Sequence, residues 1–281
     1  MNTIGITSNQ PNNSRSPKPM PELLLKLKEN NQCAFCYKVL QKIRRIRPVQ
    51  WVLIISAALL GFASLLPQSF WLGLRSMAAE HITELVLLML FGAITLSLLW
   101  ASGQKIDAAV FRFFNTRGTR TPWLDNIMRT LTELGNGFVT GLVAVYLYAR
   151  VSPHVSYVFV LSSLLLWLLV EAIKAILRRE RPFTGLKDVR VVGQRARGKS
   201  FPSGHTSQAF YTATLLLAYM DGNVIAHIII YAIALVVGIT RMYLGMHYPR
   251  DVIAGATLGI FWGCIGIIVN THIAESFLKA M

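Results

Sequence analysis

Residues 156–182 read SYVFVLSSLLLWLLVEAIKAILRRERP, an apolar run that ends in a group of charged residues and a proline. A helix that crosses a membrane needs about 20 mostly apolar residues, and Ser156–Leu177 has that length and composition. Apolar and polar residues do not alternate along it, as they would in a half-buried strand, and open sheet edges are not tolerated in lipid. The stretch therefore predicts a membrane-spanning helix that carries Lys174 and Arg181 at its charged end.

The rest of the chain repeats this pattern. Of its 281 residues, 53% are hydrophobic and 15% are charged, and the mean hydropathy is +0.48. This composition lies outside the usual range for a soluble domain. Further apolar segments lie at Trp51–Leu72, Glu84–Trp100, Phe138–Arg150, Thr206–Met220, Val224–Thr240 and Val252–Ile268. We expect an all-α fold, a polytopic membrane helical bundle of six or seven transmembrane helices in the cell membrane.

Three regions follow one another along the chain. Residues 1–50 begin with a stretch rich in Asn, Ser and Pro, expected to be disordered, and continue as a basic amphipathic segment. Residues 51–101 are expected to form N-terminal transmembrane helices, and residues 102–281 a membrane domain that carries the polar motifs. Cys33 and Cys36 form a single C-x-x-C pair. Because a closed zinc site needs four ligands, we expect no bound metal.

The formal charge of +15 raises the alternative of a nucleic-acid-binding protein. The basic residues gather instead at the ends of apolar segments, as in residues 42–47 before the first one. Cytoplasmic flanks of membrane helices are enriched in Lys and Arg. We therefore expect no nucleic acid as a partner and a cytoplasmic N-terminus. The stretch Lys105–Asn136 interleaves aromatic residues with arginines, which predicts an amphipathic segment in the headgroup layer.

The first polar signature lies at the charged end of the opening stretch, before a loop. Lys174 and Arg181 lie seven residues apart, close to two helical turns, so they share one face, and Glu171 can hold the Lys174 ammonium in place. This cluster alone is also compatible with an ordinary basic flank of a membrane helix.

The second signature is Pro202-Ser203-Gly204-His205, directly before an apolar segment. Ser203 is expected to be the N-cap of a helix whose free amides and dipole favour an anion. Gly204 lets a phosphate oxygen approach the backbone, and His205 can donate a proton near neutral pH. Capping alone would explain the serine, but it leaves the histidine without a role.

The third signature contains Arg241, His247 and Asp251. Pro249 suits the start of a helix, which places Asp251 in its first turn, where the dipole favours a carboxylate. From there Asp251 can accept a hydrogen bond from one nitrogen of His247 and leave the other nitrogen free as a nucleophile.

Taken together, the signatures resemble those of the type 2 phosphatidic acid phosphatase (PAP2) superfamily, in its integral membrane lipid phosphatase branch. The family pattern is Lys-x6-Arg-Pro, then Pro-Ser-Gly-His, then Ser-Arg-x5-His-x3-Asp. The chain matches it at Lys174, Arg181, Pro182, Pro202, Ser203, Gly204, His205, Arg241, His247 and Asp251. Thr240 stands in place of the family's serine and retains a hydroxyl. The resemblance extends over about Asp107–Ile268 and makes residues 102–281 a PAP2-like catalytic membrane domain.

The resemblance implies a two-step phosphoryl transfer that needs no metal or other cofactor. His247 attacks phosphorus to give a phosphohistidine, His205 protonates the departing oxygen, and Asp251 orients His247. The expected phosphate-binding residues are Lys174, Arg181, Ser203, Gly204 and Arg241. Fixed cations suit this role because phosphoryl transfer depends on positioning and charge neutralisation.

The many apolar segments indicate that the substrate is itself a membrane lipid phosphate, surrounded by other membrane lipids. The candidates are undecaprenyl diphosphate, phosphatidic acid, phosphatidylglycerol phosphate and lipid A phosphates. A basic loop that could hold a second phosphate favours a diphosphate slightly; its residues are Lys187, Arg190, Arg195, Arg197 and Lys199. Two alternatives are a lipid phosphotransferase that uses the same site and a non-catalytic protein that binds anionic lipids. The sequence makes no prediction of an oligomeric state.

Two arguments about which side of the membrane carries the site disagree. The family resemblance places the site outside the cytoplasm, whereas a cytoplasmic N-terminus followed by two crossings before Lys105 places it inside. The conflict disappears if the first apolar segment, which contains Pro67, does not span the membrane, if the N-terminus is outside, or if the count of seven spans is wrong. We expect an extracytoplasmic site.

Overall fold

The computed structural model describes residues 79–116, 121–220 and 223–280, with a few isolated positions before them. The chain divides into two compact units, Met1–Arg75 and Ser76–Met281, and the second unit contains the polar motifs. The predictions for residues 1–50 lie outside the described residues, and those for Trp51–Leu72 almost entirely so.

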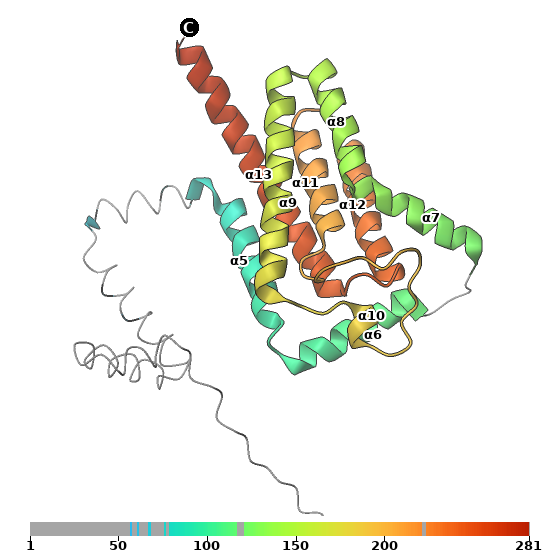
Figure 1. The fold of residues 1–281 in the computed structure, drawn as a ribbon. Helices are drawn as coiled ribbons and strands as arrows, with labels where there is room; N and C mark the ends of the chain where they lie inside the picture. The colour runs from blue at the N-terminus through green and yellow to red at the C-terminus, as the bar shows by residue number, and fades with distance from the viewer. Residues whose placement is uncertain are drawn as a thin grey trace, which may run out of the picture. The chain divides into compact units, whose positions relative to one another are not determined.

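The second unit is a bundle of helices (Figure 1), which confirms the all-α fold, and the described residues contain no strand. Its α-helices are α5 (Ile82–Ser97), α6 (Ala101–Thr116), α7 (Pro122–Thr132), α8 (Gly137–Arg150), α9 (Pro153–Leu177), α10 (Pro182–Gly185), α11 (Gly204–Ala218), α12 (Val224–Tyr243) and α13 (Pro249–Ala280). A short 3-10 helix, η2 (Glu133–Gly135), joins α7 to α8. The apolar segments expected from residue 84 onward all appear as helices.

Helix α11 lies at the centre of the bundle and packs against α9, α12 and α13. Its Tyr211 and Leu215 belong to a buried apolar cluster with Phe159 and Leu166 of α9. Helix α13 approaches α11 closely through glycines: a Cβ atom on Gly255 would lie 2.7 Å from the carbonyl oxygen of Ser203. This close approach brings the start of α13 next to the start of α11.

By length and composition, the described residues include three helices able to cross a membrane, within Pro153–Gly185, Val224–Tyr243 and Pro249–His272. Helices α5 and α6 would add a fourth span as a pair, but the chain bends by 98° between them. Helices α8 and α11 have 14 and 15 residues, which at 1.5 Å per residue gives about 22 Å against a hydrocarbon core of about 30 Å. The described residues therefore give three or four crossings by length, fewer than the six or seven expected.

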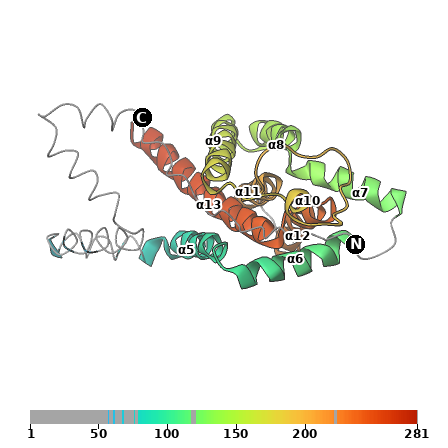
Figure 2. The ribbon, with the colours of Figure 1, turned by 60° about the horizontal axis from the view of Figure 1, so that its bottom comes forward.

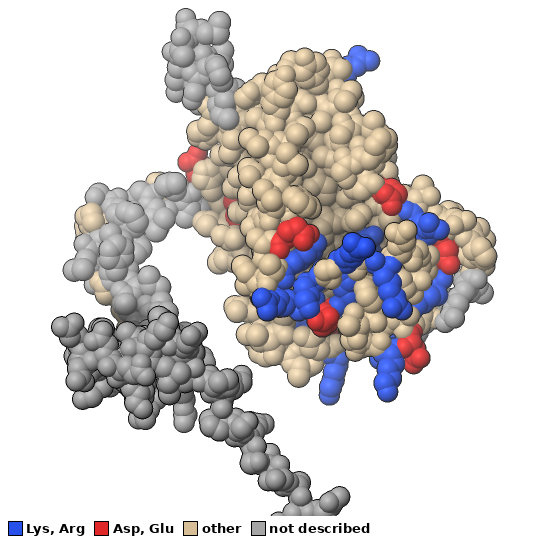
Figure 3. Space-filling model, in the orientation of Figure 1, with Lys and Arg blue, Asp and Glu red and all other residues tan. Residues whose placement is uncertain are grey.

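The outer surface of the bundle is apolar. Helix α9 exposes Leu161, Leu165 and Trp167, and α12 exposes Ile228 and Ile229. In Figure 3 the upper part of the molecule shows almost no charge, and the Lys and Arg side chains gather at the lower end. An apolar belt of this kind on long helices is the surface that a lipid bilayer covers, so the chain is a membrane protein.

Helices α6 and α7 lie at the charged end of the bundle. Figure 2, with this end turned forward, shows α6 running beside α10 and α12. The inner face of α6 carries buried Asp107, Phe111 and Asn115 at intervals of four residues, whereas Ile106 and Phe113 are more than half exposed on the outside. The structure thus agrees with an amphipathic segment between the second and third apolar runs.

Candidate active site

The three polar signatures meet at the charged end of the bundle, where α9 and α12 end and α11 and α13 begin (Figure 1). The Nη1 atom of Arg181 lies 3.3 Å from Nε2 of His247. The backbone N–H of Ser203 donates to the carbonyl oxygen of Asp251 at 3.0 Å, and a Cβ atom on Gly204 would lie 3.7 Å from Nζ of Lys174. Segments far apart in the sequence therefore form a single site.

His247 is almost fully buried, and both of its ring nitrogens have neighbours. Nδ1 lies 2.8 Å from the carbonyl oxygen of Ser200. Because a carbonyl oxygen only accepts hydrogen bonds, the proton must be on Nδ1. Nε2 then carries the lone pair, which agrees with its position beside Arg181, a group that only donates. This tautomer leaves Nε2 as the nucleophilic atom.

Asp251 lies close to His247 but is not its nearest hydrogen-bond acceptor. Its Oδ2 is 3.6 Å from Nδ1 of His247 and accepts the backbone N–H of Tyr248 at 2.8 Å. Its Oδ1 lies 2.5 Å from Nη1 of Arg179. The structure differs here from the sequence expectation: the Ser200 carbonyl is the nearest acceptor for the imidazole, and Asp251 places a negative charge beside it.

Arg179 and its partners are functional candidates that the sequence reasoning missed. Arg179 forms ion pairs with both Asp251 and Asp107, and its guanidinium lies 4.4 Å from the centre of the Tyr248 ring. Asp107 also accepts from Nε of Arg250 at 2.7 Å. A signal was present, because Asp107 shares one face of an amphipathic segment with Phe111, and a buried carboxylate requires a partner.

The guanidinium groups of Arg181 and Arg241 are buried, with side chains held by neutral groups. Arg181 donates to the carbonyl oxygens of Gly198 and Met246 at 3.0 and 3.1 Å. Arg241 donates from Nη1 to Oγ1 of Thr132 at 2.9 Å, and its Nε has no hydrogen-bond partner among the described residues. Since removing charge from water is costly unless the charge is paired, these two cations favour an anion between them.

The first two signatures supply further polar groups. Lys174 Nζ lies 2.7 Å from Glu171, as expected. Ser203 precedes the first residue of α11, as expected for an N-cap, but its hydroxyl pairs with Oγ1 of Thr206 at 2.8 Å and makes no capping hydrogen bond. The start of α11 thus lacks a side-chain cap from Ser203. Gly204, the first residue of this helix, lies beside Lys174.

Burial lowers the pKa of His205 and of His247 to about 3 in each case. The nearby cations Arg181 and Arg241 act in the same direction, because a second positive charge beside them is unfavourable. Both imidazoles are therefore neutral near pH 7. For His205 to donate a proton, an anion must first enter the site and reverse the local field.

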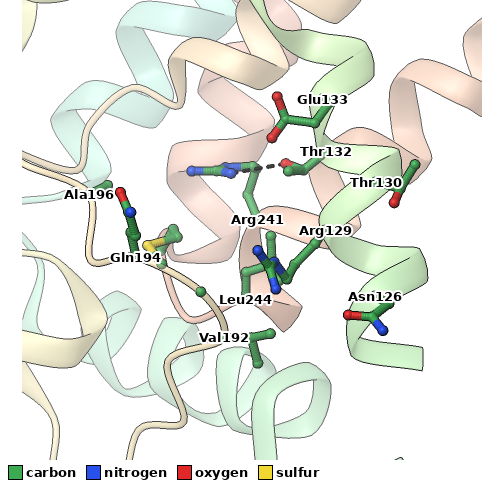
Figure 4. A pocket seen from close by; sticks show the side chains of 12 residues that line it. Asn126, Arg129, Thr130, Thr132, Glu133, Val192, Gln194, Ala196, Arg241 and Leu244 are labelled. Carbon is green, nitrogen blue, oxygen red and sulfur yellow. Dashed lines mark hydrogen bonds between the residues drawn. The ribbon is translucent and has the colours of Figure 1, made fainter. Parts of the chain in front are cut away.

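Two cavities adjoin the site. The larger, of about 610 Å³, is shown in Figure 4 and is lined by residues of α7, η2, the loop 192–196 and the end of α12, including Arg129, Glu133 and Arg241. The other, of about 370 Å³, lies among η2, α9 and α11 and includes Lys174 and His205. Each cavity therefore carries a different part of the predicted phosphate site.

The basic loop is partly neutralised by carboxylates. Arg190 forms an ion pair with Asp125 at 2.7 Å, and Lys199 forms one with Glu180 at 2.5 Å. Two of the five charges expected to hold a second phosphate thus have structural partners. Among the described residues, no group of three or more His, Cys, Asp or Glu side chains is placed to hold a metal ion.

Comparisons with known proteins agree with the motifs. The sequence profile of the PAP2 superfamily matches residues 153–273. The chain is 28% identical over 191 residues to an undecaprenyl-diphosphatase of Sulfolobus acidocaldarius, covering 66% of this chain and 90% of the relative.

Two solved structures are also similar to this chain. A transmembrane PAP2 type phosphatidylglycerolphosphate phosphatase from Bacillus subtilis superposes with a TM-score of 0.59 at 25% identity, over 68% of this chain and 96% of that one. LpxE of Aquifex aeolicus superposes with a TM-score of 0.51 at 30% identity, over 57% and 93% of the two chains. The chain therefore belongs to the PAP2 superfamily, and it is a membrane phosphatase.

Proposed function

We propose that the protein removes a phosphate group from a membrane lipid through a phosphohistidine on His247. The observation that carries the proposal is the state of the His247 imidazole. Its Nδ1 proton is directed to the Ser200 carbonyl, and its Nε2 lone pair is next to the buried cation Arg181. A neutral nucleophile beside fixed positive charge suits attack on a phosphate group.

In the first step, Nε2 of His247 forms a bond to phosphorus while the bond from phosphorus to the lipid oxygen breaks. His205, which becomes protonated once the anionic substrate is bound, gives this proton to that oxygen and becomes neutral, and the lipid product departs. In the second step, His205 takes a proton from water, the water oxygen bonds to phosphorus, and the bond to Nε2 breaks to release inorganic phosphate. Both His205 and His247 end the cycle in their starting states.

The remaining residues hold charge in place during these steps. Arg181, Arg241 and Lys174 neutralise the phosphoryl oxygens, with Ser203 and the start of α11 at Gly204 beside them. Asp251 stabilises the positive charge that develops on the His247 ring when Nε2 is phosphorylated. Neither buried guanidinium group forms an ion pair with a carboxylate of the described residues.

The proposed substrate is a lipid diphosphate of the undecaprenyl diphosphate type. The relative from Sulfolobus acidocaldarius, of which the chain covers 90%, is an undecaprenyl-diphosphatase. In the basic loop, Arg195 and Arg197 remain without an ion pair among the described residues, so the loop keeps charge for a second phosphate. Phosphatidic acid, phosphatidylglycerol phosphate and lipid A phosphates are the comparison substrates.

The test is phosphate release by the purified full chain in detergent, with EDTA present, from each of these lipids. His247→Ala should reduce release to about a thousandth or less of the wild-type rate. His227→Ala is the matched control, because His227 lies near the start of α12 and its Nδ1 lies 3.1 Å from the carbonyl oxygen of Asn223, the N-cap of that helix. Equal release by wild type and His247→Ala would contradict the proposal. Loss of phosphate from the lipid only when an alcohol or second lipid is added, with that acceptor phosphorylated and no inorganic phosphate released, would identify a phosphotransferase.

The site is proposed to face the extracytoplasmic side, in line with the family resemblance. In a chain with Cys33, Cys36 and Cys264 replaced, Gln194→Cys would place one thiol in the exposed loop beside the site. Val151→Cys would place a thiol at the turn between α8 and α9, at the other end of the bundle. An impermeant maleimide should label the first variant in intact cells and the second only after permeabilisation. The reverse pattern would place the site in the cytoplasm.

A further inference from the structure

The candidate active site lies between two cavities whose linings differ in polarity. The cavity of about 370 Å³ is lined by apolar residues of α9, such as Leu166, Trp167 and Val170, together with Lys174 and His205. The cavity of about 610 Å³ has a larger share of polar groups, among them Asn126, Arg129, Thr130, Glu133, Gln194 and Arg241, beside the apolar Val192, Leu244 and Met246. An apolar ligand suits the first cavity, and a hydrated anion suits the second.

The 3-10 helix η2 forms the wall between the cavities. Thr132 and Glu133 line the polar cavity, and Gly135 and Asn136 line the apolar one. Gly135 packs so closely on α11 that a Cβ atom there would lie 2.6 Å from the carbonyl oxygen of His205. The two cavities therefore adjoin different residues of the candidate active site, with η2 lining both of them.

The proposed chemistry assigns the apolar cavity to the lipid, and the role of the polar cavity rests on that proposed function. His205 protonates the departing lipid oxygen, and His205 lines the apolar cavity. The lipid product must therefore lie there when the bond breaks. Water for the second step attacks from the same side, because it too approaches phosphorus opposite His247 and gives its proton to His205. Inorganic phosphate is formed among the proposed phosphate-binding cations, of which Arg241 also lines the polar cavity.

Arg241 connects the catalytic centre to the polar cavity. Its side chain is 6% exposed, and its Nε has no hydrogen-bond partner among the described residues. Figure 4 shows its guanidinium extending across the cavity above Arg129. Arg129 is exposed and forms no ion pair with a described carboxylate. An anion leaving Arg241 would next meet Arg129.

We propose that the cavity lined by Arg129, Glu133 and Arg241 binds the inorganic phosphate after its release and leads it to solvent, separately from the lipid product. Glu133 should weaken phosphate binding in this cavity. Its carboxylate lines the same cavity as the two arginines, so it opposes the anion that they attract. Weak binding suits a product site, since tight binding would inhibit turnover.

Removing the charge of Arg129 and removing the charge of Glu133 should change phosphate binding in opposite directions. Inorganic phosphate is the probe, and its inhibition constant is measured with the full chain in detergent. Arg129→Gln should raise this constant by about threefold to tenfold, and Glu133→Gln should lower it by a similar factor, as expected for one charge near a partly hydrated anion. Arg150→Gln, at the other end of the bundle, is the control and should leave the constant unchanged. All three side chains are exposed, so folding should persist.

Two results would overturn the assignment. One is an inhibition constant that neither Arg129→Gln nor Glu133→Gln changes. The other is a higher KM for the lipid in Arg129→Gln with the inhibition constant of phosphate unchanged. This result would indicate that the cavity binds the lipid substrate. Equilibrium dialysis with radioactive phosphate makes the same comparison without turnover. It therefore tests the phosphate site even if the phosphohistidine route is wrong.

Discussion

Arg179 lies 2.5 Å from the carboxylate of Asp251 and so occupies the oxygen that does not face His247. The same guanidinium forms an ion pair with Asp107 of α6, and both carboxylates are buried. Asp251 is therefore held between a fixed cation on one side and the imidazole on the other. This arrangement makes Arg179 a positioning residue for the catalytic histidine, although it lies outside the three family motifs.

Replacing Arg179 should impair catalysis more than binding. In Arg179→Gln the buried Asp251 loses its cation, and the carboxylate should move toward Nδ1 of His247. We expect kcat to fall by about 10- to 100-fold with KM changed much less, because the loss acts on the geometry of the nucleophile. Steady-state kinetics on the preferred lipid measure both constants. Arg178→Gln is the control, since Arg178 is exposed and its Nε donates to the carbonyl oxygen of Ala175 within the preceding helical turn.

The same cluster predicts a compensation between two buried charges. Arg179→Gln alone leaves Asp107 with its ion pair to Arg250 and Asp251 without an ion pair to a described Lys or Arg, and an unpaired buried charge costs several kcal/mol. Adding Asp107→Asn restores the charge balance and should recover much of the lost thermal stability while kcat stays low. If the double variant is less stable than either single variant, the cluster is not held by charge pairing.

The stability of the folded protein should decrease as the pH is lowered, because of the two buried histidines. In the folded protein the pKa of His205 and of His247 is about 3, whereas in the unfolded chain both titrate near 6.5. Between these values the unfolded chain binds more protons, so their contribution is complete above about pH 6.5 and is lost as the pH falls toward 3. Melting temperatures in detergent measure the effect. The double variant His205→Asn/His247→Asn should show a shallower slope, and an unchanged slope would rule out these groups.

The contact between α11 and α13 should not tolerate even one added methyl group. In Gly255→Ala the new Cβ would lie 2.7 Å from the Ser203 carbonyl oxygen, and overpacking of this kind costs about 1–3 kcal/mol. We expect lower stability and lower activity together, because the shift displaces the start of α11. Gly141→Ala in α8 is the control: nothing lies within 4 Å of the new atom, so it should be neutral or stabilising. Equal melting temperatures would contradict the close packing.

Much of the fold could be predicted from the apolar periodicity and the motif positions. The described apolar segments became helices, and the residues quoted from the three signatures lie at one end of the bundle. The number of crossings was harder to predict. The expected segments Phe138–Arg150 and Thr206–Met220 nearly coincide with α8 and α11, whose 14 and 15 residues are fewer than the about 20 of a full span.

Other features of the site leave no clear mark on a sequence. The nearest acceptor for the His247 imidazole is the backbone carbonyl of Ser200, and a carbonyl is present at every residue. The ion pairs of Asp107 with Arg179 and Arg250 join positions more than 70 residues apart. Nothing in their spacing indicates such a contact, since only the packing of α6 across the end of the bundle brings them together.

The most direct test of the central claim is to trap the phosphorylated protein. The full chain is mixed with lipid carrying radioactive phosphate, quenched in alkali and digested, and the labelled peptide is identified by mass spectrometry. The account predicts one alkali-stable, acid-labile phosphate on His247, absent from His247→Ala and present in His227→Ala. Label on another residue, or rapid turnover in His247→Ala, would show that the phosphoryl group does not pass through His247.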